Sequence, residues 1–87
     1  INRQDLFLLI YRAMKYVGME IEPDTAALSK FKDADLIGSY AKDAVSALVK
    51  ANIVAGDQNG YINPKATATR AEAAMLIYRI YYKMQQK

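Results

Sequence analysis

The residues best suited to chemistry stand where a turn-rich loop meets a predicted helix. Thr69 and Glu72 are spaced as in a capping box, in which the hydroxyl accepts from the Glu72 amide and the carboxylate accepts from the Thr69 amide. Arg70 then takes the first helical position, where a cation beside the positive end of the helix dipole costs about 0.3 to 1 kcal/mol. A solvated surface arginine and an anion site both account for this placement, because helix-start amides and a guanidinium suit a carboxylate or phosphate.

The composition excludes several other chemistries. The 87 residues include no Cys and no His, which removes disulfides, thiol nucleophiles, the usual zinc sites and the commonest general base. The net charge is +3, but Lys and Arg are scattered along the chain, so nucleic-acid binding is not expected. No apolar run approaches the ~20 residues of a membrane span. No cofactor is predicted.

The carboxylates suggest two further kinds of site, and neither is supported. Asp57 begins a segment that resembles an EF-hand loop, but Ile62 stands where glycine is required and Ala68 where a bidentate glutamate is required. Metal binding is therefore not predicted. Paired carboxylates also cleave glycosides, but nothing in the sequence places two of them across a deep pocket. We predict no catalytic residue and no enzymatic activity.

Three main helices, joined by long irregular loops, are predicted to position these residues. Apolar residues recur at helical spacing over residues 3–17, 38–51 and 70–84. Asn2 is the expected N-cap of the first helix, Asp5 suits the positive end of its dipole, and Gly18 is its expected stop. One further helical turn is expected after Asp24. The predicted fold class is all-α.

An internal repeat relates the first and last helices. A shift of 67 residues places Asn2 on Thr69, Arg3 on Arg70 and Asp5 on Glu72, and both copies contain Leu-Ile-Tyr-Arg. We therefore expect residues 1–17 to be the closing helix of one repeat, residues 18–30 a connector and residues 31–87 a complete second repeat. Because stacked repeats bury faces that single repeats expose, this chain is expected to form a homo-oligomer or to exchange helices between copies.

An ordered set of positions resembles the S-layer homology (SLH) motif. The matching residues are Phe31, Asp33, Ile37, Tyr40-Ala41, Ala44-Val45, Leu48, Ile53-Val54, Gly56, Asn59-Gly60, Asn63-Pro64 and Thr69-Arg70-Ala71-Glu72. The resemblance implies a non-catalytic anchor built from three tandem repeats in a pseudo-threefold helical assembly. Such modules hold secreted proteins on bacterial cell-wall polysaccharide, often pyruvylated, at grooves between repeats. The implied location is the bacterial cell surface, cell wall or S-layer.

The same resemblance implies the ligand-binding residues. Arg70 corresponds to the arginine that meets the acidic group of the saccharide, with Thr69 beside it, and Arg3 occupies the same place in the earlier repeat. Residues 2–5 are a degenerate form of the tetrapeptide, so the stronger expectation falls on Arg70. Tyr40 stands where many relatives have Trp and offers a ring for stacking on a sugar. Asp33 matches an acid that accepts from sugar hydroxyls or caps the following helix.

Glu72 is interpreted as structural, since the capping box explains it. The last helix carries a tyrosine-rich surface, at Tyr78, Tyr81 and Tyr82. Such a surface also fits a helical protein-interaction or S-layer assembly module without direct sugar binding.

Overall fold

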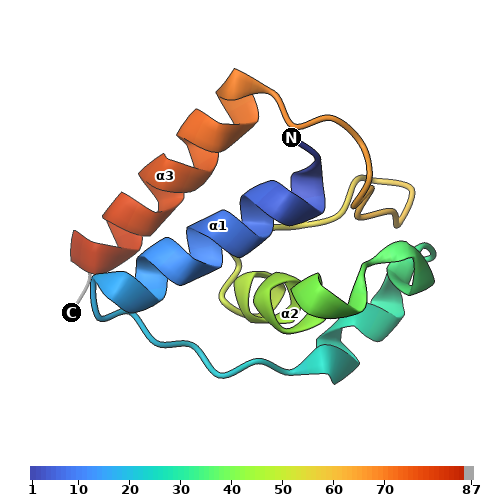
Figure 1. Ribbon diagram of the computed structural model, residues 1–87, viewed down its shortest axis with the longest axis horizontal. Coiled ribbons are helices and arrows are strands. Elements are labelled where there is room, and N and C mark those ends of the chain that lie inside the picture. Colours follow the sequence, from blue (N-terminus) through green and yellow to red (C-terminus); the bar gives the residue numbers. More distant parts are fainter. Residues whose placement is uncertain (86–87) are drawn as a thin grey trace.

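The helices follow one another in the predicted order (Figure 1). In this computed structural model, which describes residues 1–85, the α-helices are α1 (Arg3–Tyr16), α2 (Lys42–Lys50) and α3 (Arg70–Gln85). Three short 3-10 helices lie between α1 and α2: η1 (Thr25–Lys30), η2 (Ala34–Leu36) and η3 (Ser39–Ala41). Within the described part of the chain, β-type pairing is limited to one isolated bridge between Asn2 and Thr67. The all-α prediction is confirmed; the last two residues of the predicted repeat lie outside the described residues.

Local signals set both ends of α1. The side chain of Asn2 accepts a hydrogen bond from the Asp5 amide at 2.9 Å, as predicted for the N-cap. At the other end Gly18 adopts a φ of +87°, and the Met19 amide donates to the Met14 carbonyl at 2.8 Å. This is the Schellman arrangement, and it confirms Gly18 as the stop of the helix.

Two further predicted elements form: the helix over residues 38–51 and the turn after Asp24. Both contain 3-10 helix. The 3-10 helix η3 occupies the start of the first segment, and the α-helical part begins only at Lys42. The Asp24 side chain caps η1 by accepting from the Ala26 amide at 3.2 Å. The connector is therefore more ordered than the sequence indicated.

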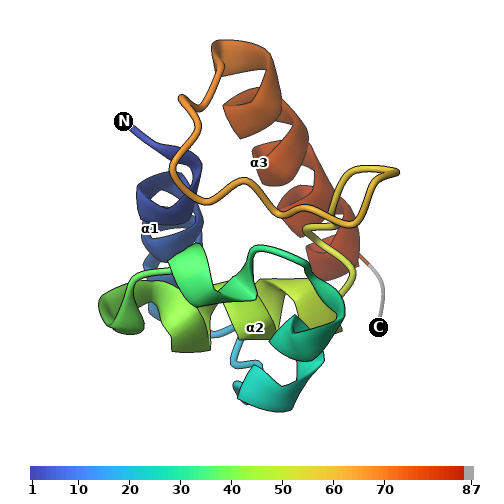
Figure 2. The ribbon, with the colours of Figure 1, turned by 90° about the vertical axis from the view of Figure 1, so that its right-hand side faces the viewer.

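The core lies where α1 crosses α2, and α1 also contacts η3 and α3 (Figures 1 and 2). The largest fully buried apolar side chains come from α1, α2 and the loop that follows: Phe7, Met14, Leu48, Ile53, Ile62 and Val45. The helical spacing of apolar residues in α1 does not by itself identify the buried face. Phe7 and Tyr11 are buried, whereas Leu9 and Val17 are each 54% exposed.

The long loop between α2 and α3 holds the start of α1. The Arg3 amide donates to the Ala66 carbonyl, and the Gln4 amide donates to the Pro64 carbonyl, both at 2.8 Å. The loop therefore satisfies the first two amides of α1, which have no partner within the helix. Figure 2 shows this loop passing from α2 across the start of α1 before it enters α3.

The last helix, α3, runs beside α1 in the same general direction (Figure 1). Its buried residue is Leu76, and its other large apolar side chains are partly or largely exposed. No helix among residues 1–85 combines the length and apolar character needed to cross a bilayer.

Candidate functional site

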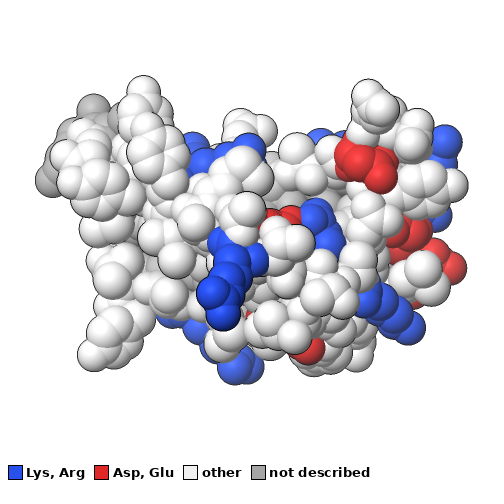
Figure 3. Space-filling model, turned by 90° about the horizontal axis from the view of Figure 1, so that it is seen from above, with Lys and Arg blue, Asp and Glu red and all other residues white. Residues whose placement is uncertain are grey.

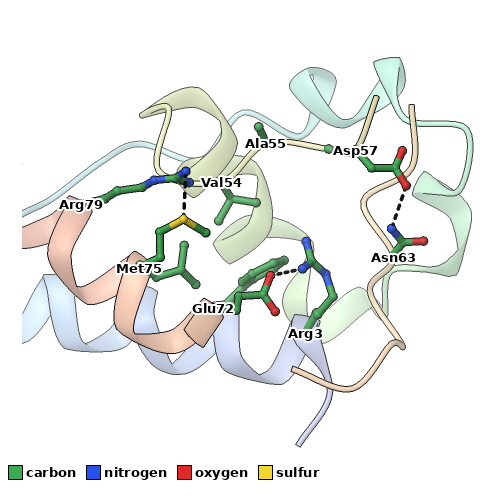
Figure 4. Close-up of a pocket in the computed structure, with 11 residues that line it drawn as sticks. Arg3, Val54, Ala55, Asp57, Asn63, Glu72, Met75 and Arg79 are labelled. Atoms are coloured by element: carbon green, nitrogen blue, oxygen red, sulfur yellow. Dashed lines mark hydrogen bonds and ion pairs between the residues drawn. The ribbon is translucent and has the colours of Figure 1, made fainter. Parts of the chain in front are cut away.

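A pocket of about 320 Å³ lies between the start of α1, the first turns of α3 and residues 54–57 of the loop (Figure 4). We call it the Arg3 pocket. Its polar lining consists of Arg3, Asp57, Asn63, Glu72 and Arg79. Apolar atoms of the lining come from α1, α3 and the loop, which gives a polar site with apolar walls. This composition suits a polar ligand that also presents an apolar face.

Arg3 lines the pocket from the start of α1. Its Nε donates to the Ile62 carbonyl at 3.1 Å, and its guanidinium carbon lies 5.1 Å from the centre of the Phe7 ring. Its Nη1 forms an ion pair with Oε2 of Glu72, and the two side chains are only 20% and 15% exposed. Burial lowers the pKa of Arg3, and the charges of Asp57 and Asp33 oppose that shift. The group remains a cation at neutral pH because an arginine side chain stays protonated in proteins.

The predicted capping box forms only by half. The Thr69 hydroxyl accepts from the Glu72 amide at 3.0 Å, as predicted. The Glu72 carboxylate turns to Arg3 rather than back to the Thr69 amide, because a partly buried guanidinium is a stronger partner than a neutral amide. The structural interpretation of Glu72 is thus altered: its carboxylate joins the starts of α1 and α3, which are far apart in sequence.

Asp57 organises the loop that forms the opposite wall. It accepts hydrogen bonds from the amides of Asn59 and Tyr61 at 2.9 and 3.0 Å and from the side-chain amide of Asn63 at 3.2 Å. These hydrogen bonds, above all the one from the Tyr61 amide, lower the pKa of Asp57. The start of the EF-hand-like segment therefore serves to fix a turn. Within residues 1–85, no group of three or more His, Cys, Asp or Glu side chains is placed to hold a metal ion.

Gly56 allows this loop to lie against the core. A Cβ atom at Gly56 would lie 2.5 Å from a ring carbon of Phe31, a separation that real side chains do not reach. The residue is therefore fixed by close packing, and the loop brings Asp57 to the pocket.

Asp33 acts beneath the loop rather than in the pocket. It is 8% exposed, and its two oxygens accept from the amides of Ile62 and Asn63, each at 2.9 Å. It makes no side-chain cap for η2, so the capping alternative is wrong. Its binding to sugar hydroxyls stays a prediction, with both oxygens already accepting hydrogen bonds from the backbone.

The other predicted ligand residues lie away from the Arg3 pocket. Arg70 is exposed at the start of α3, next to Thr69, and neither residue lines the pocket. Tyr40 is 57% exposed, and its hydroxyl donates to Oδ1 of Asp5 at 2.6 Å, which raises the pKa of Tyr40. The structure therefore brings only Arg3 of the predicted ligand set into the pocket.

Sequence reasoning missed Arg79, the second cation of the pocket. Its Nη1 donates to the Ile53 carbonyl at 2.7 Å, and its Nη2 lies 3.4 Å from the Met75 sulfur. Glu72, Met75 and Arg79 are three and four residues apart, so they share one face of α3 (Figure 4). That spacing was the available signal, together with the repeated Leu-Ile-Tyr-Arg segment that ends at Arg79.

Charge around the site is mixed in sign. Figure 3 shows basic and acidic side chains interspersed on the face seen from above, with blue and red groups in contact near its centre. The polar lining of the Arg3 pocket likewise holds two cations, Arg3 and Arg79, and two anions, Asp57 and Glu72. The site is therefore suited to pairing with individual groups rather than to attracting a polyanion.

Comparisons with known proteins relate the chain to one family and to several large surface proteins and enzymes. The sequence model of the S-layer homology domain matches residues 30–74. A surface-layer 125 kDa protein of Lysinibacillus sphaericus is 45% identical over 51 residues, which cover 59% of this chain and 4% of that protein. An amylopullulanase of Thermoanaerobacterium thermosulfurigenes is 34% identical over 83 residues, covering 95% of this chain and 4% of the enzyme. The exoglucanase XynX of Acetivibrio thermocellus is also 34% identical over 83 residues, covering 95% of this chain and 8% of the enzyme. The chain thus spans less than a tenth of the length of these curated relatives.

Proposed function

The chain belongs to the S-layer homology family, and on that premise we propose that it anchors a secreted protein non-covalently to cell-wall polysaccharide at the bacterial surface. The observation that carries the proposal is the Arg3 pocket, in which Arg3 from the first copy of the repeated helix faces residues 54–57 of the matched repeat. The pocket therefore lies between the two predicted repeat units, residues 1–17 and residues 31–87. The relatives support the same role, because a short shared segment in a surface-layer protein and in two enzymes suits a common attachment function.

The proposed ligand is an acidic saccharide, and a ketal-linked pyruvate would supply its carboxylate. The Arg3 guanidinium pairs with a carboxylate in a fixed, planar geometry, and its partial burial strengthens that pairing. Met75, which is 46% exposed, provides apolar surface for a sugar ring, and Asn63 offers its side-chain oxygen to hydroxyl groups.

The carboxylates of the pocket favour binding over catalysis. A glycosidase needs one carboxylic acid with a raised pKa to protonate the leaving group. Asp57 has a lowered pKa, and Glu72 is paired with Arg3. The proposed role is therefore that of a non-enzymatic module.

A second site of the same kind is proposed at Arg70, completed by an adjacent repeat. In this chain the loop carbonyls of Pro64 and Ala66 satisfy the first amides of α1 beside Arg3. Among the described residues, no loop carbonyl does the same for the first two amides of α3 beside Arg70. The loop of a following repeat would supply them, as expected for a pseudo-threefold assembly, and Thr69 and Arg70 would then line a groove.

The exposed face of α3 favours a second function, that of an interaction surface for another S-layer homology repeat. Ile77 and Tyr78 are 59% and 65% exposed, whereas Ile10 and Tyr11, their counterparts in α1, are 7% exposed. The helix α1 packs against α2 and η3 of the matched repeat, whereas α3 packs against α1. The corresponding occupant of α3 is therefore the same part of an adjacent repeat or of a second copy. Ile77→Asp should abolish any concentration-dependent association seen by analytical ultracentrifugation, while Leu9→Asp, on an exposed face of α1, should not.

The test of the anchoring function is binding to purified cell walls and to a pyruvylated wall saccharide. Arg3→Ala is expected to lose binding, with the greater loss for the pyruvylated form. Arg12→Ala is the matched control, because Arg12 is exposed on α1 and does not line the pocket. Circular dichroism checks that each variant keeps its helices. Equal binding by Arg3→Ala and the unaltered chain would show that the Arg3 pocket is not the binding site.

A further inference from the structure

The ion pair between Arg3 and Glu72 fills the place on the arginine that a ligand carboxylate needs. We propose that Glu72 is an internal competitor: an acidic saccharide binds by exchanging its own carboxylate for that of Glu72. The inference rests on the proposed function and adds a specificity-determining residue to it. It makes Glu72 a determinant of affinity in addition to a link between helices.

The donor geometry of Arg3 carries the argument. A guanidinium can receive a carboxylate bidentately along the edge that joins Nε to one terminal nitrogen or along the edge that joins the two terminal nitrogens. Nε already donates to the Ile62 carbonyl, which leaves the edge formed by Nη1 and Nη2. Glu72 already pairs with Nη1, one of the two nitrogens of that edge. A bidentate ligand carboxylate therefore competes with Glu72 for Nη1.

Glu72 is the anion of the pocket that is free to move. Asp57 is fixed by three hydrogen bonds from its own loop. The Glu72 carboxylate has Arg3 as its partner among the described residues, and the N-cap contact to Thr69 uses the Glu72 amide instead. The carboxylate can therefore leave Arg3 without unwinding the start of α3.

The exchange would select acidic ligands over neutral ones. With Glu72 in place, the formal charges of Arg3, Arg79, Asp57 and Glu72 cancel, so the pocket has no excess positive charge to offer. A neutral sugar cannot replace the charge-assisted hydrogen bond that Arg3 would lose. A carboxylate restores that bond, so only an anionic saccharide offsets the displacement of Glu72.

The test compares Glu72→Gln with the unaltered chain by isothermal titration calorimetry against a pyruvylated wall saccharide and its depyruvylated form. Gln keeps the shape of the side chain and removes its charge. We expect about tenfold tighter binding of the pyruvylated saccharide, since the ligand no longer competes with a charged partner. Glu20→Gln is the matched control, because Glu20 is exposed in the connector and does not line the Arg3 pocket. Its affinity should stay within about twofold of the unaltered chain.

The outcomes separate this inference from the proposed function. If the unaltered chain binds through Arg3, and Glu72→Gln binds equally or more weakly while remaining folded, then Glu72 is only a structural partner and the inference is wrong. If Arg3→Ala, Glu72→Gln and the unaltered chain all fail to bind, the proposed function fails and the inference falls with it. Thermal unfolding of each variant shows that a lost signal does not reflect a lost fold.

Discussion

The helices α1 and α3 carry the same sequence pattern, yet they bury different faces. Ile10 is 7% exposed in α1 and its counterpart Ile77 is 59% exposed in α3, whereas Leu9 is 54% exposed and its counterpart Leu76 is 2% exposed. The difference arises from neighbours: α1 packs on α2 and η3, while α3, among the helices of residues 1–85, contacts α1 alone. Helical periodicity therefore defines which residues share a face, and the surrounding repeat decides which face is buried.

The largest effect is expected at the isoleucine pair. Ile10→Ala should lower the free energy of unfolding by about 2 to 4 kcal/mol, because it removes buried methyl groups and leaves a cavity. Ile77→Ala should change it by less than about 0.5 kcal/mol, since that side chain is exposed. Urea unfolding of dilute protein measures both. Equal losses at the two positions would show that both side chains are buried in solution, contrary to the prediction.

The leucine pair should give the opposite order. Leu76→Ala is expected to lower the free energy of unfolding by about 2 to 3 kcal/mol, because it removes a buried side chain. Leu9→Ala should lower it by less than about 0.5 kcal/mol. The same unfolding assay applies. A larger loss for Leu9→Ala would mean that the exposed face of α1 has a partner within the folded chain.

Substitutions at the two helix starts should have similar effects. Asn2 caps α1 by accepting from the Asp5 amide, and Thr69 caps α3 by accepting from the Glu72 amide. Asn2→Ala and Thr69→Ala should each lower the free energy of unfolding by about 1 kcal/mol. Thr69→Ser should recover most of the loss at α3. No effect at Thr69 would indicate that the start of α3 unwinds without affecting the fold.

The acidic residues that follow these caps should differ in a pH titration. Asp5 accepts from the Tyr40 hydroxyl, which raises the pKa of Tyr40, whereas Glu72 pairs with Arg3. Because the folded pKa of Tyr40 lies above the unfolded value, the stabilisation is present below pH ~10 and is lost as pH rises through the folded pKa. Carbon-13 NMR of the tyrosine rings should show a lower Tyr40 pKa in Asp5→Asn and no change in Glu72→Gln. An unchanged Tyr40 pKa in Asp5→Asn would show that the hydrogen bond to Asp5 does not cause the shift.

The sequence predicts the local features of this fold well because their causes are local. Asn2, Gly18 and Thr69 each act on amides or carbonyls within a few residues, so the cap and stop signals could be identified directly. The shift of 67 residues also identified Arg3 as the counterpart of Arg70.

The features that escaped prediction depend on distant parts of the chain. Arg3 and Glu72 are 69 residues apart, and their ion pair exists only because the loop brings the starts of α1 and α3 together. Asp33 binds amides about 30 residues away, so its role beneath the loop carried no sequence signal of its own. The choice of buried face could not be predicted either, because the two copies share one spacing.

The most direct test of the Arg3 pocket as the saccharide site is a comparison of Arg3→Ala with Arg70→Ala in binding a pyruvylated wall saccharide. Arg3 lies in the pocket formed with the loop, whereas Arg70 occupies the matching position at an exposed helix start. We predict that Arg3→Ala abolishes binding and that Arg70→Ala retains it in this chain. Loss of binding in Arg70→Ala with full binding in Arg3→Ala, both variants folded, would contradict the account.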